Sequence, residues 1–219
     1  MKKTLYLTLI LCWTSSYANF DVKQEMAVLT AQTKINPKVL TLALNAFNVA
    51  AKDGLSSKPI LTVVDYSLPS TAKRMWIFDL AKKQLLFNTL VAHGKNSGEN
   101  YAKSFSDKMG TLKSSFGVFV TANTYEGQHG YSLKLKGLEP GINDLAEERL
   151  IVMHGAWYVD EAIAKLKGRI GRSWGCFAVN ENLAAPIINT VKDGSLIFAY
   201  YPDKTWIKHS KYLALNSVI

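Results

Sequence analysis

Two residues in the second half of the chain could carry out nucleophilic chemistry together. Cys176 is a thiol that follows a glycine, and His154 directly follows the apolar run at residues 150–153. A thiol reacts as its thiolate, and an imidazole nearby is the usual base that removes its proton. Because two neighbouring strands can end side by side, the sequence predicts that Cys176 and His154 form a pair of nucleophile and base.

The residues around this pair indicate how a developing negative charge would be held. The sequence Ser173-Trp174-Gly175-Cys176 predicts a tight turn, in which the backbone N–H groups of Trp174, Gly175 and Cys176 could bind an acyl oxygen. Ser173 could hydrogen-bond either the turn or a substrate. Gly155 allows the chain to turn sharply after His154. We expect this chemistry to need no metal and no cofactor.

Two other interpretations use some of the same residues. Gly171-x-Ser173-x-Gly175 matches the nucleophile elbow of serine hydrolases, but that elbow follows a hydrophobic strand, whereas the basic stretch at 165–169 precedes it here. A zinc site is the second alternative, although no two of its candidate ligands have the close spacing typical of zinc sites. Those candidates are His93, His129, His154 and Cys176.

Short strands make up most of the elements that must position these side chains. Two helices are expected within residues 21–52, with Asn36 as N-cap, Pro37 at the first position of the second helix and Gly54 after its end. A helix with Pro186 near its start should precede Asp193. The expected strands cover residues 61–66, 74–80, 84–91, 116–122, 131–135, 150–153 and 195–201. This pattern favours a mainly β fold with some α structure, a sandwich or a barrel.

The N-terminus has the pattern of an export signal. Lys2 and Lys3 precede an apolar stretch at residues 5–13 that is too short to span a bilayer, and Ser16-Tyr17-Ala18 is a small-x-small cleavage site. We expect cleavage before residue 19 and no stable membrane insertion of the mature chain. The expected location is the periplasm, or another part of the cell envelope to which the protein is exported.

The charge and cysteine content fit an exported protein. The formal net charge is +9 at pH 7, of which Lys2 and Lys3 contribute two, and such a charge suits anionic surroundings such as the cell wall. Export argues against a nucleic-acid partner. Cys12 is removed with the signal, so Cys176 is the only thiol of the mature chain and cannot form an intrachain disulfide.

These residues resemble a known family. His154-Gly155 followed by Ser173-Trp174-Gly175-Cys176 is similar to the His…Ser-x-Gly-Cys signature of the YkuD-like L,D-transpeptidase superfamily, the cysteine enzymes of peptidoglycan. Further stretches resemble the branch called the murein L,D-transpeptidase catalytic domain family, and the likeness covers roughly residues 61–202. Those stretches are residues 91–94, 114–117, 125–130, 138–143 and 171–176.

The resemblance implies an L,D-transpeptidase-like β-sandwich with short N-terminal helices. It also implies that Cys176 attacks the carbonyl of the third residue of a tetrapeptide stem, usually meso-diaminopimelate, and expels D-alanine. His154 would take the thiol proton, with its other ring nitrogen held by a backbone carbonyl. The acyl group then passes to an amine, which gives a 3-3 cross-link, or to water. Peptidoglycan stem peptides are the implied partners.

The chain departs from the superfamily pattern at two positions. Trp174 stands where most members have histidine, and Ala178 stands where an arginine is common. Another residue must then recognise the carboxylate of the stem peptide. The candidates are Arg172, Arg169 and Arg149, with His129 as a further candidate for substrate binding.

The sequence divides into four parts. We expect a signal peptide at residues 1–18, an N-terminal helical segment at 19–58, the catalytic domain at 59–203 and a tail at 204–219. A peptidoglycan L,D-transpeptidase is the favoured function. An L,D-carboxypeptidase or an amidase with the same dyad is the nearest alternative. A non-catalytic cell-wall-binding module is the alternative from a different class.

Overall fold

The computed structural model describes residues 22–213, so the expected signal peptide at residues 1–18 lies outside the described residues. The elements follow in the order α1 (Val22–Ala31), α2 (Pro37–Lys52), β1 (Ile60–Asp65), β2 (Met75–Asp79), β3 (Gln84–Thr89), the 3-10 helix η1 (Lys95–Ser97), β4 (Gly117–Gly127), β5 (Gly130–Gly137), β6 (Val152–Ala156), α3 (Glu161–Lys167), β7 (Phe177–Asn180), α4 (Glu181–Val191), β8 (Leu196–Tyr200) and α5 (Lys204–His209). Within residues 22–213, no helix has the length and apolar character needed to cross a membrane.

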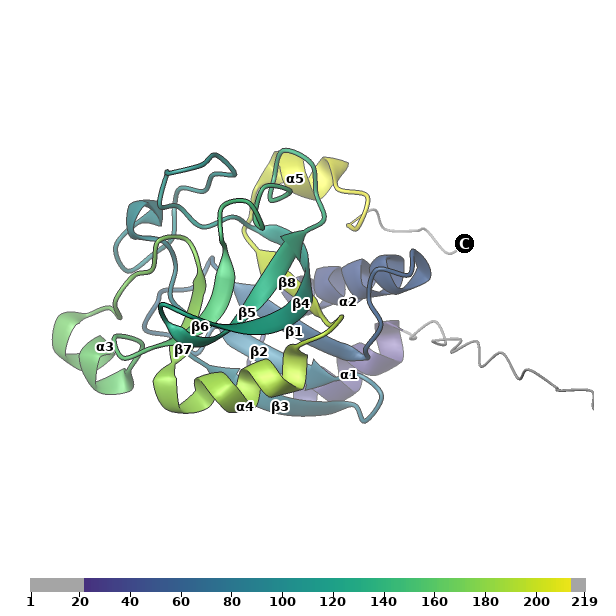
Figure 1. Ribbon diagram of the computed structural model, residues 1–219. Coiled ribbons are helices and arrows are strands. Elements are labelled where there is room, and N and C mark those ends of the chain that lie inside the picture. Colours follow the sequence, from purple (N-terminus) through teal and green to yellow (C-terminus); the bar gives the residue numbers. More distant parts are fainter. Residues whose placement is uncertain (1–21, 214–219) are drawn as a thin grey trace, which may run out of the picture.

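The eight strands within residues 22–213 belong to one curved sheet, in the order β3-β2-β1-β8-β4-β5-β6-β7 (Figure 1). The pairs β1–β8 and β6–β7 are parallel, and the other neighbours are antiparallel. The chain after β3 returns to the outer edge of β7, where the Ala92 N–H donates to the Ala178 carbonyl at 2.9 Å. The sheet therefore curls toward closure, and the predicted mainly β fold with some α structure is confirmed.

Helices cover both faces of the central strands. In β1, Leu61 and Val63 contribute to a core shared with α2, whereas Val64 belongs to a second core shared with α4. Figure 1 shows α4 and the α1–α2 pair on different sides of β1. A strand buried on both faces reads as a nearly continuous apolar run, which is the pattern of residues 60–64, where Thr62 is the one polar residue.

The predicted start and end of the second helix are confirmed. α2 begins at Pro37, and the Asn36 side chain accepts a hydrogen bond from the Lys38 N–H at 2.9 Å. Gly54, with φ of +70°, follows the end of the helix. The position of Pro186 was predicted wrongly. It lies well inside α4, because Asn180 caps that helix and starts it at Glu181.

Two segments near the site differ from the sequence-based expectation. The strand expected at residues 150–153 begins only at Val152, because Leu150 has φ of +55° and an exposed side chain. In the predicted tail at 204–219, for which the sequence indicated no element, the described residues form α5, whose buried Trp206 donates to the Glu139 carboxylate at 2.9 Å. The domain boundaries at residues 58 and 203 remain predictions.

Candidate active site

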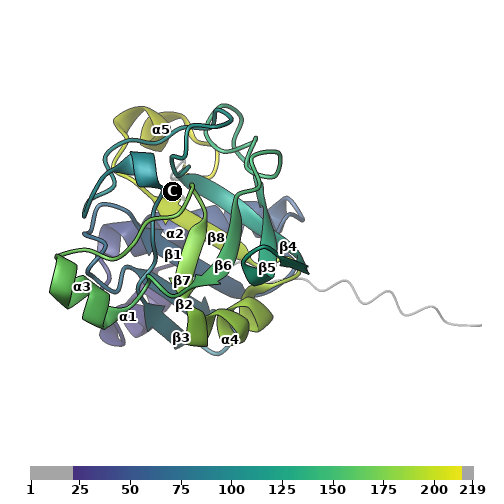
Figure 2. The same ribbon diagram turned by 60° about the vertical axis from the view of Figure 1, so that its left-hand side comes forward.

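Cys176 and His154 come together because β6 and β7 are parallel neighbours (Figure 2). Met153 pairs with Phe177, and His154 pairs with Ala178. Cross-strand partners point to the same face of a sheet, so Cys176, one residue before Phe177, stands opposite Val152 on the face that carries His154. The thiol and the imidazole therefore lie on one face of adjacent strands, and their role as nucleophile and base stays a prediction. The described residues show no hydrogen bond between them, which is common in catalytic pairs without substrate.

His154 is held in one orientation and in one protonation state. Its Nδ1 lies 2.8 Å from the Gly155 carbonyl oxygen, and a carbonyl can only accept, so Nδ1 carries the hydrogen and Nε2 has a free lone pair. Burial lowers the pKa of His154, the Gly155 carbonyl partly opposes this effect, and the nearby His129 lowers the pKa further. The ring is therefore neutral at neutral pH and can accept a proton.

His129 covers the His154 ring. The two imidazoles are stacked, with ring centroids 4.3 Å apart and an angle of 17° between their planes. His129 lies in the turn between β4 and β5, so this hairpin bends over the base. Gly155, the residue after His154, packs closely against α4. A Cβ atom there would lie 3.0 Å from the Cβ of Ala184, so a larger residue would push α4 away.

The Cys176 thiol sits where burial disfavours its charged form. It donates a hydrogen bond to the Leu150 carbonyl at 3.5 Å, an acceptor that the unusual φ of Leu150 turns toward the sulfur. Burial raises the pKa of Cys176 above its ordinary value, although the Val152 N–H and the Arg149 guanidinium oppose this effect. A base beside a thiol would by itself be expected to lower this pKa. In the resting site the pKa is raised instead, because desolvation outweighs the favourable contacts.

Ser173 and Gly175 shape the turn that carries the thiol. The Ser173 hydroxyl donates to the Cys176 carbonyl at 2.7 Å and accepts from the Gly175 N–H at 3.1 Å. Ser173 is buried and acts on the turn itself. Gly175 has φ of +121°, and a Cβ atom there would lie 2.8 Å from the Lys113 carbonyl oxygen. Of the three amides expected to bind an oxyanion, that of Gly175 is therefore already engaged.

Two loops that were not among the predicted site residues support the turn around Cys176, one at His93 and Gly94 and the other at Ser114. The Ser114 hydroxyl accepts from the Gly94 N–H at 2.9 Å and donates to the Gly175 carbonyl at 3.3 Å. The Ser173 N–H donates to the His93 carbonyl at 3.0 Å. A signal for both loops was available, since residues 91–94 and 114–117 lie in stretches that resemble the family.

His93 has a structural role in one of these loops. Its Nδ1 accepts a hydrogen bond from the buried Arg74 guanidinium at 2.8 Å, and its Nε2 donates to the Gly98 carbonyl at 3.2 Å. Burial, followed by the positive charge of Arg74, lowers the pKa of His93 to about 4. Both ring nitrogens of His93 are thus bound by the protein itself. His93 is not part of the His129–His154 stack.

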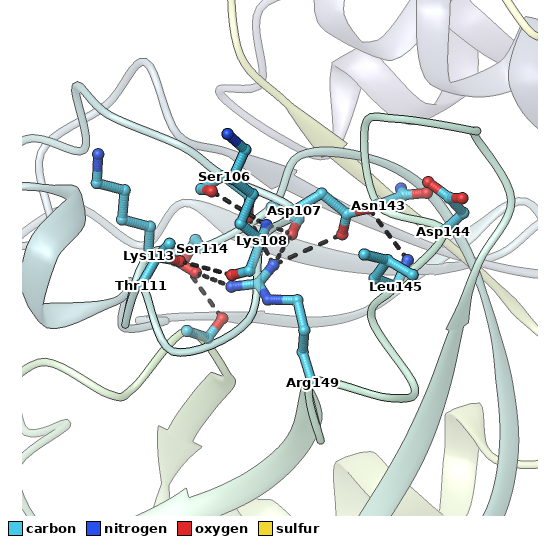
Figure 3. Close-up of polar contacts among 12 residues, drawn as sticks. Ser106, Asp107, Lys108, Thr111, Lys113, Ser114, Asn143, Asp144, Leu145 and Arg149 are labelled. Carbon is cyan, nitrogen blue, oxygen red and sulfur yellow. Dashed lines mark hydrogen bonds and ion pairs between the residues drawn. The ribbon is translucent and has the colours of Figure 1, made fainter.

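The Arg149 guanidinium, a predicted substrate-binding group, is bound by the protein itself (Figure 3). Its guanidinium donates to the Ser106 carbonyl, the Ser115 hydroxyl and the Lys113 carbonyl, each at 2.6 Å. An ion pair of 3.6 Å to Asp107 completes the cluster, and only 3% of the Arg149 side chain is exposed. With so many protein acceptors, Arg149 fixes the loop at residues 106–115 against the catalytic turn.

Arg172 is likewise engaged by the protein. It pairs with the Glu99 carboxylate at 2.6 Å and donates to the Lys95 and Gly98 carbonyls. Arg169 binds the other oxygen of the same carboxylate at 2.9 Å. The structure therefore places His129 on His154, with Cys176 on the same face of the sheet, whereas the predicted arginines brace the surrounding loops. Trp174, in the turn before Cys176, is 74% exposed.

Comparisons with known proteins point in one direction. A family model described as L,D-transpeptidase catalytic domain matches residues 31–200. No match was found among curated proteins. Among solved structures, an L,D-transpeptidase from Mycobacterium smegmatis is similar, with 14% identity and a TM-score of 0.40, over 65% of this chain and 59% of that one. An L,D-transpeptidase from Stackebrandtia nassauensis has 11% identity and a TM-score of 0.38, over 82% of this chain and 90% of that one.

The family match carries the assignment. This chain covers less than two thirds of the Mycobacterium smegmatis protein, and structural likeness at these TM-scores adds nothing to an argument about activity. The matched residues, in contrast, span every strand of the sheet, both histidines of the stack and the whole turn around Cys176. The chain therefore belongs to the family of L,D-transpeptidase catalytic domains.

Proposed function

We propose that this protein is a peptidoglycan L,D-transpeptidase of the cell envelope, with Cys176 as nucleophile and His154 as general base. The observation that carries the proposal is the shared face of β6 and β7, on which the thiol stands beside an imidazole whose Nδ1 is bound to a carbonyl. The single thiol expected in the mature chain and the export signal support the same function. The envelope is where peptidoglycan is found.

The first half of the reaction forms a thioester. His154 Nε2 takes the proton from Cys176 Sγ while the sulfur attacks the carbonyl carbon of the third residue of a tetrapeptide stem. The N–H groups of Trp174 and Cys176 then stabilise the oxyanion, since the Gly175 N–H is bound to Ser173. The bond to D-alanine breaks, and the imidazolium of His154 returns its proton to the leaving amine.

The second half transfers the acyl group. The side-chain amine of another stem attacks the thioester, and His154 accepts a proton from that amine. The carbon–sulfur bond breaks, and the thiolate takes the proton back from His154. The product is a 3-3 cross-link. Water in place of the amine would release a tripeptide, which is the L,D-carboxypeptidase reaction.

Incubation with disaccharide-tetrapeptide fragments, followed by mass spectrometry, tests the proposal. We expect release of D-alanine and dimers joined through two third-position residues. Tripeptides without dimers would instead identify a carboxypeptidase. Cleavage of cross-linked dimers with no change in tetrapeptides would identify an amidase. Cys176→Ala must abolish the activity. No change of any stem peptide would leave the wall-binding module as the function.

A further inference from the structure

A cavity of about 220 Å³ lies beside the proposed nucleophile. Its walls come from β4, β5 and the chain that leads into β6, and include Tyr125, Lys134, Glu147, Leu150, Ile151 and Val152. Two of these residues adjoin Cys176, because the thiol donates to the Leu150 carbonyl at 3.5 Å and the Val152 N–H faces the sulfur. A side chain next to an acyl carbon on this sulfur could therefore enter the cavity.

The strand register places the charged wall of the cavity on the catalytic face. Lys134 pairs with Val152, and Ser132 pairs with His154. Paired residues share a face, so Lys134 stands on the same face as His154, on the next strand. Since neighbouring strands are about 4.8 Å apart, the Lys134 backbone is about 10 Å from Cys176, two strands away. The side chain of one long amino acid can bridge that distance.

The two charges in the cavity have opposite signs. Lys134 supplies an ammonium group whose Nζ lies 5.8 Å from the centre of the Tyr125 ring, and Glu147 supplies a carboxylate. Neither forms an ion pair with another residue within 22–213. Leu150, Ile151 and Val152 offer apolar surface between them and the thiol. Such a cavity fits a side chain with an aliphatic stem and an end that carries both an amine and a carboxylate.

We propose that Lys134 and Glu147 determine which residue the enzyme accepts at the acyl position. In this assignment Lys134 binds the terminal carboxylate of that side chain, Glu147 binds its terminal amine, and the apolar wall contacts its methylene groups. The assignment rests on the proposed function and adds the residues that select the donor. It also explains how the chain recognises a carboxylate although Arg149 and Arg172 are engaged elsewhere.

Four tetrapeptides that differ only in the third residue test this proposal. That residue would be diaminopimelate, with both groups, lysine, with the amine only, 2-aminopimelate, with the carboxylate only, or norleucine, with neither. Loss of one partly exposed ion pair, either that of Lys134 or that of Glu147, should lower kcat/KM for D-alanine release about fivefold. The parent protein should therefore prefer diaminopimelate about fivefold over each singly charged residue. Lys134→Met should erase its preference over lysine, and Glu147→Gln its preference over 2-aminopimelate.

Matched variants outside the cavity separate this effect from a general change in charge. Lys136→Met removes an exposed lysine from the same strand, and Glu148→Gln removes the carboxylate next to Glu147, but neither residue lines the cavity. Both variants should keep the preference of the parent. If Lys134→Met and Glu147→Gln also keep it, or if the parent turns over all four peptides equally, the assignment is overturned while the proposed function stands.

A binding measurement covers the case in which the proposed function fails. Tripeptides that end at each of the four third residues are added before iodoacetamide, and the rate of Cys176 alkylation is measured. Protection by the diaminopimelate tripeptide, reduced about fivefold in Lys134→Met, would support the cavity assignment even if no tetrapeptide is turned over. Equal protection by all four, or by none, would overturn it.

Discussion

Replacing Arg149 by methionine should destabilise the protein strongly, although Arg149 was expected to be a substrate-binding residue. Methionine cannot supply the three hydrogen bonds of 2.6 Å that Arg149 donates, and it leaves the buried Asp107 carboxylate without its ion pair. Breaking a buried pair in this way costs about 3–5 kcal/mol. For a chain of this length each kcal/mol lowers the melting temperature by about 2–4 °C, so Arg149→Met should melt about 10 °C below the parent.

Three companion variants make this prediction precise. Arg149→Lys keeps the charge but cannot span three acceptors, so its loss should be about half as large. Arg149→Met combined with Asp107→Leu removes both charges and should recover part of the stability. Arg169→Met breaks the exposed pair with Glu99 and should cost less than about 1 kcal/mol. A melting temperature of Arg149→Met within about 2 °C of the parent would refute the role of this cluster.

Because the pKa of Cys176 is raised, its iodoacetamide labelling should still accelerate as the pH rises above the ordinary thiol pKa of about 8.5, and a plateau at neutral pH would contradict a raised pKa. The pKa of His154 lies below its usual 6.5, so D-alanine release should decline only as His154 is protonated in more acidic solution. His129→Ala should move that decline to higher pH, because it exposes the His154 ring and removes the charge of His129. His129→Phe keeps the ring covered and should move the decline less, and profiles identical to that of the parent would exclude His129. Intact-mass analysis of exported protein should show loss of the first 18 residues, and a mature protein that retains Met1 would argue against export.

The sequence indicated that His154 and Cys176 lie on neighbouring strands, as β6 and β7 do, but it did not indicate which loops surround them. His154 and Cys176 could be paired because each adjoins a short apolar run, and such runs become neighbouring strands. The direction of the Cys176 pKa shift could not be predicted in the same way. It depends on how far folding desolvates the sulfur, and only the assembled structure shows this.

The arginines show a second limit of the sequence. Arg172 lies in the segment of the turn and Arg149 lies just before the apolar run that leads to His154, which suggested contact with a substrate. Their partners nevertheless come from residues 95–115. A single sequence contains no information about which distant loop packs on a given arginine. Trp206 was missed for the same reason, since its segment looks polar and its burial depends on Glu139, far away in sequence.

The closure of the sheet has a consequence for the durability of the site. Residues 92–95 form a seam with β7 and the turn before it, through bonds that join Ala92 to Ala178, Ser173 to His93 and Lys95 to Ser173. A few hydrogen bonds between loops open more easily than the paired strands of a core. The nucleophile sits at this seam, so the earliest local opening would release the turn while most of the sheet stays folded. Rising urea should therefore abolish D-alanine release before it changes the circular dichroism of the strands, and coincident loss of both signals would show that the seam is as strong as the core.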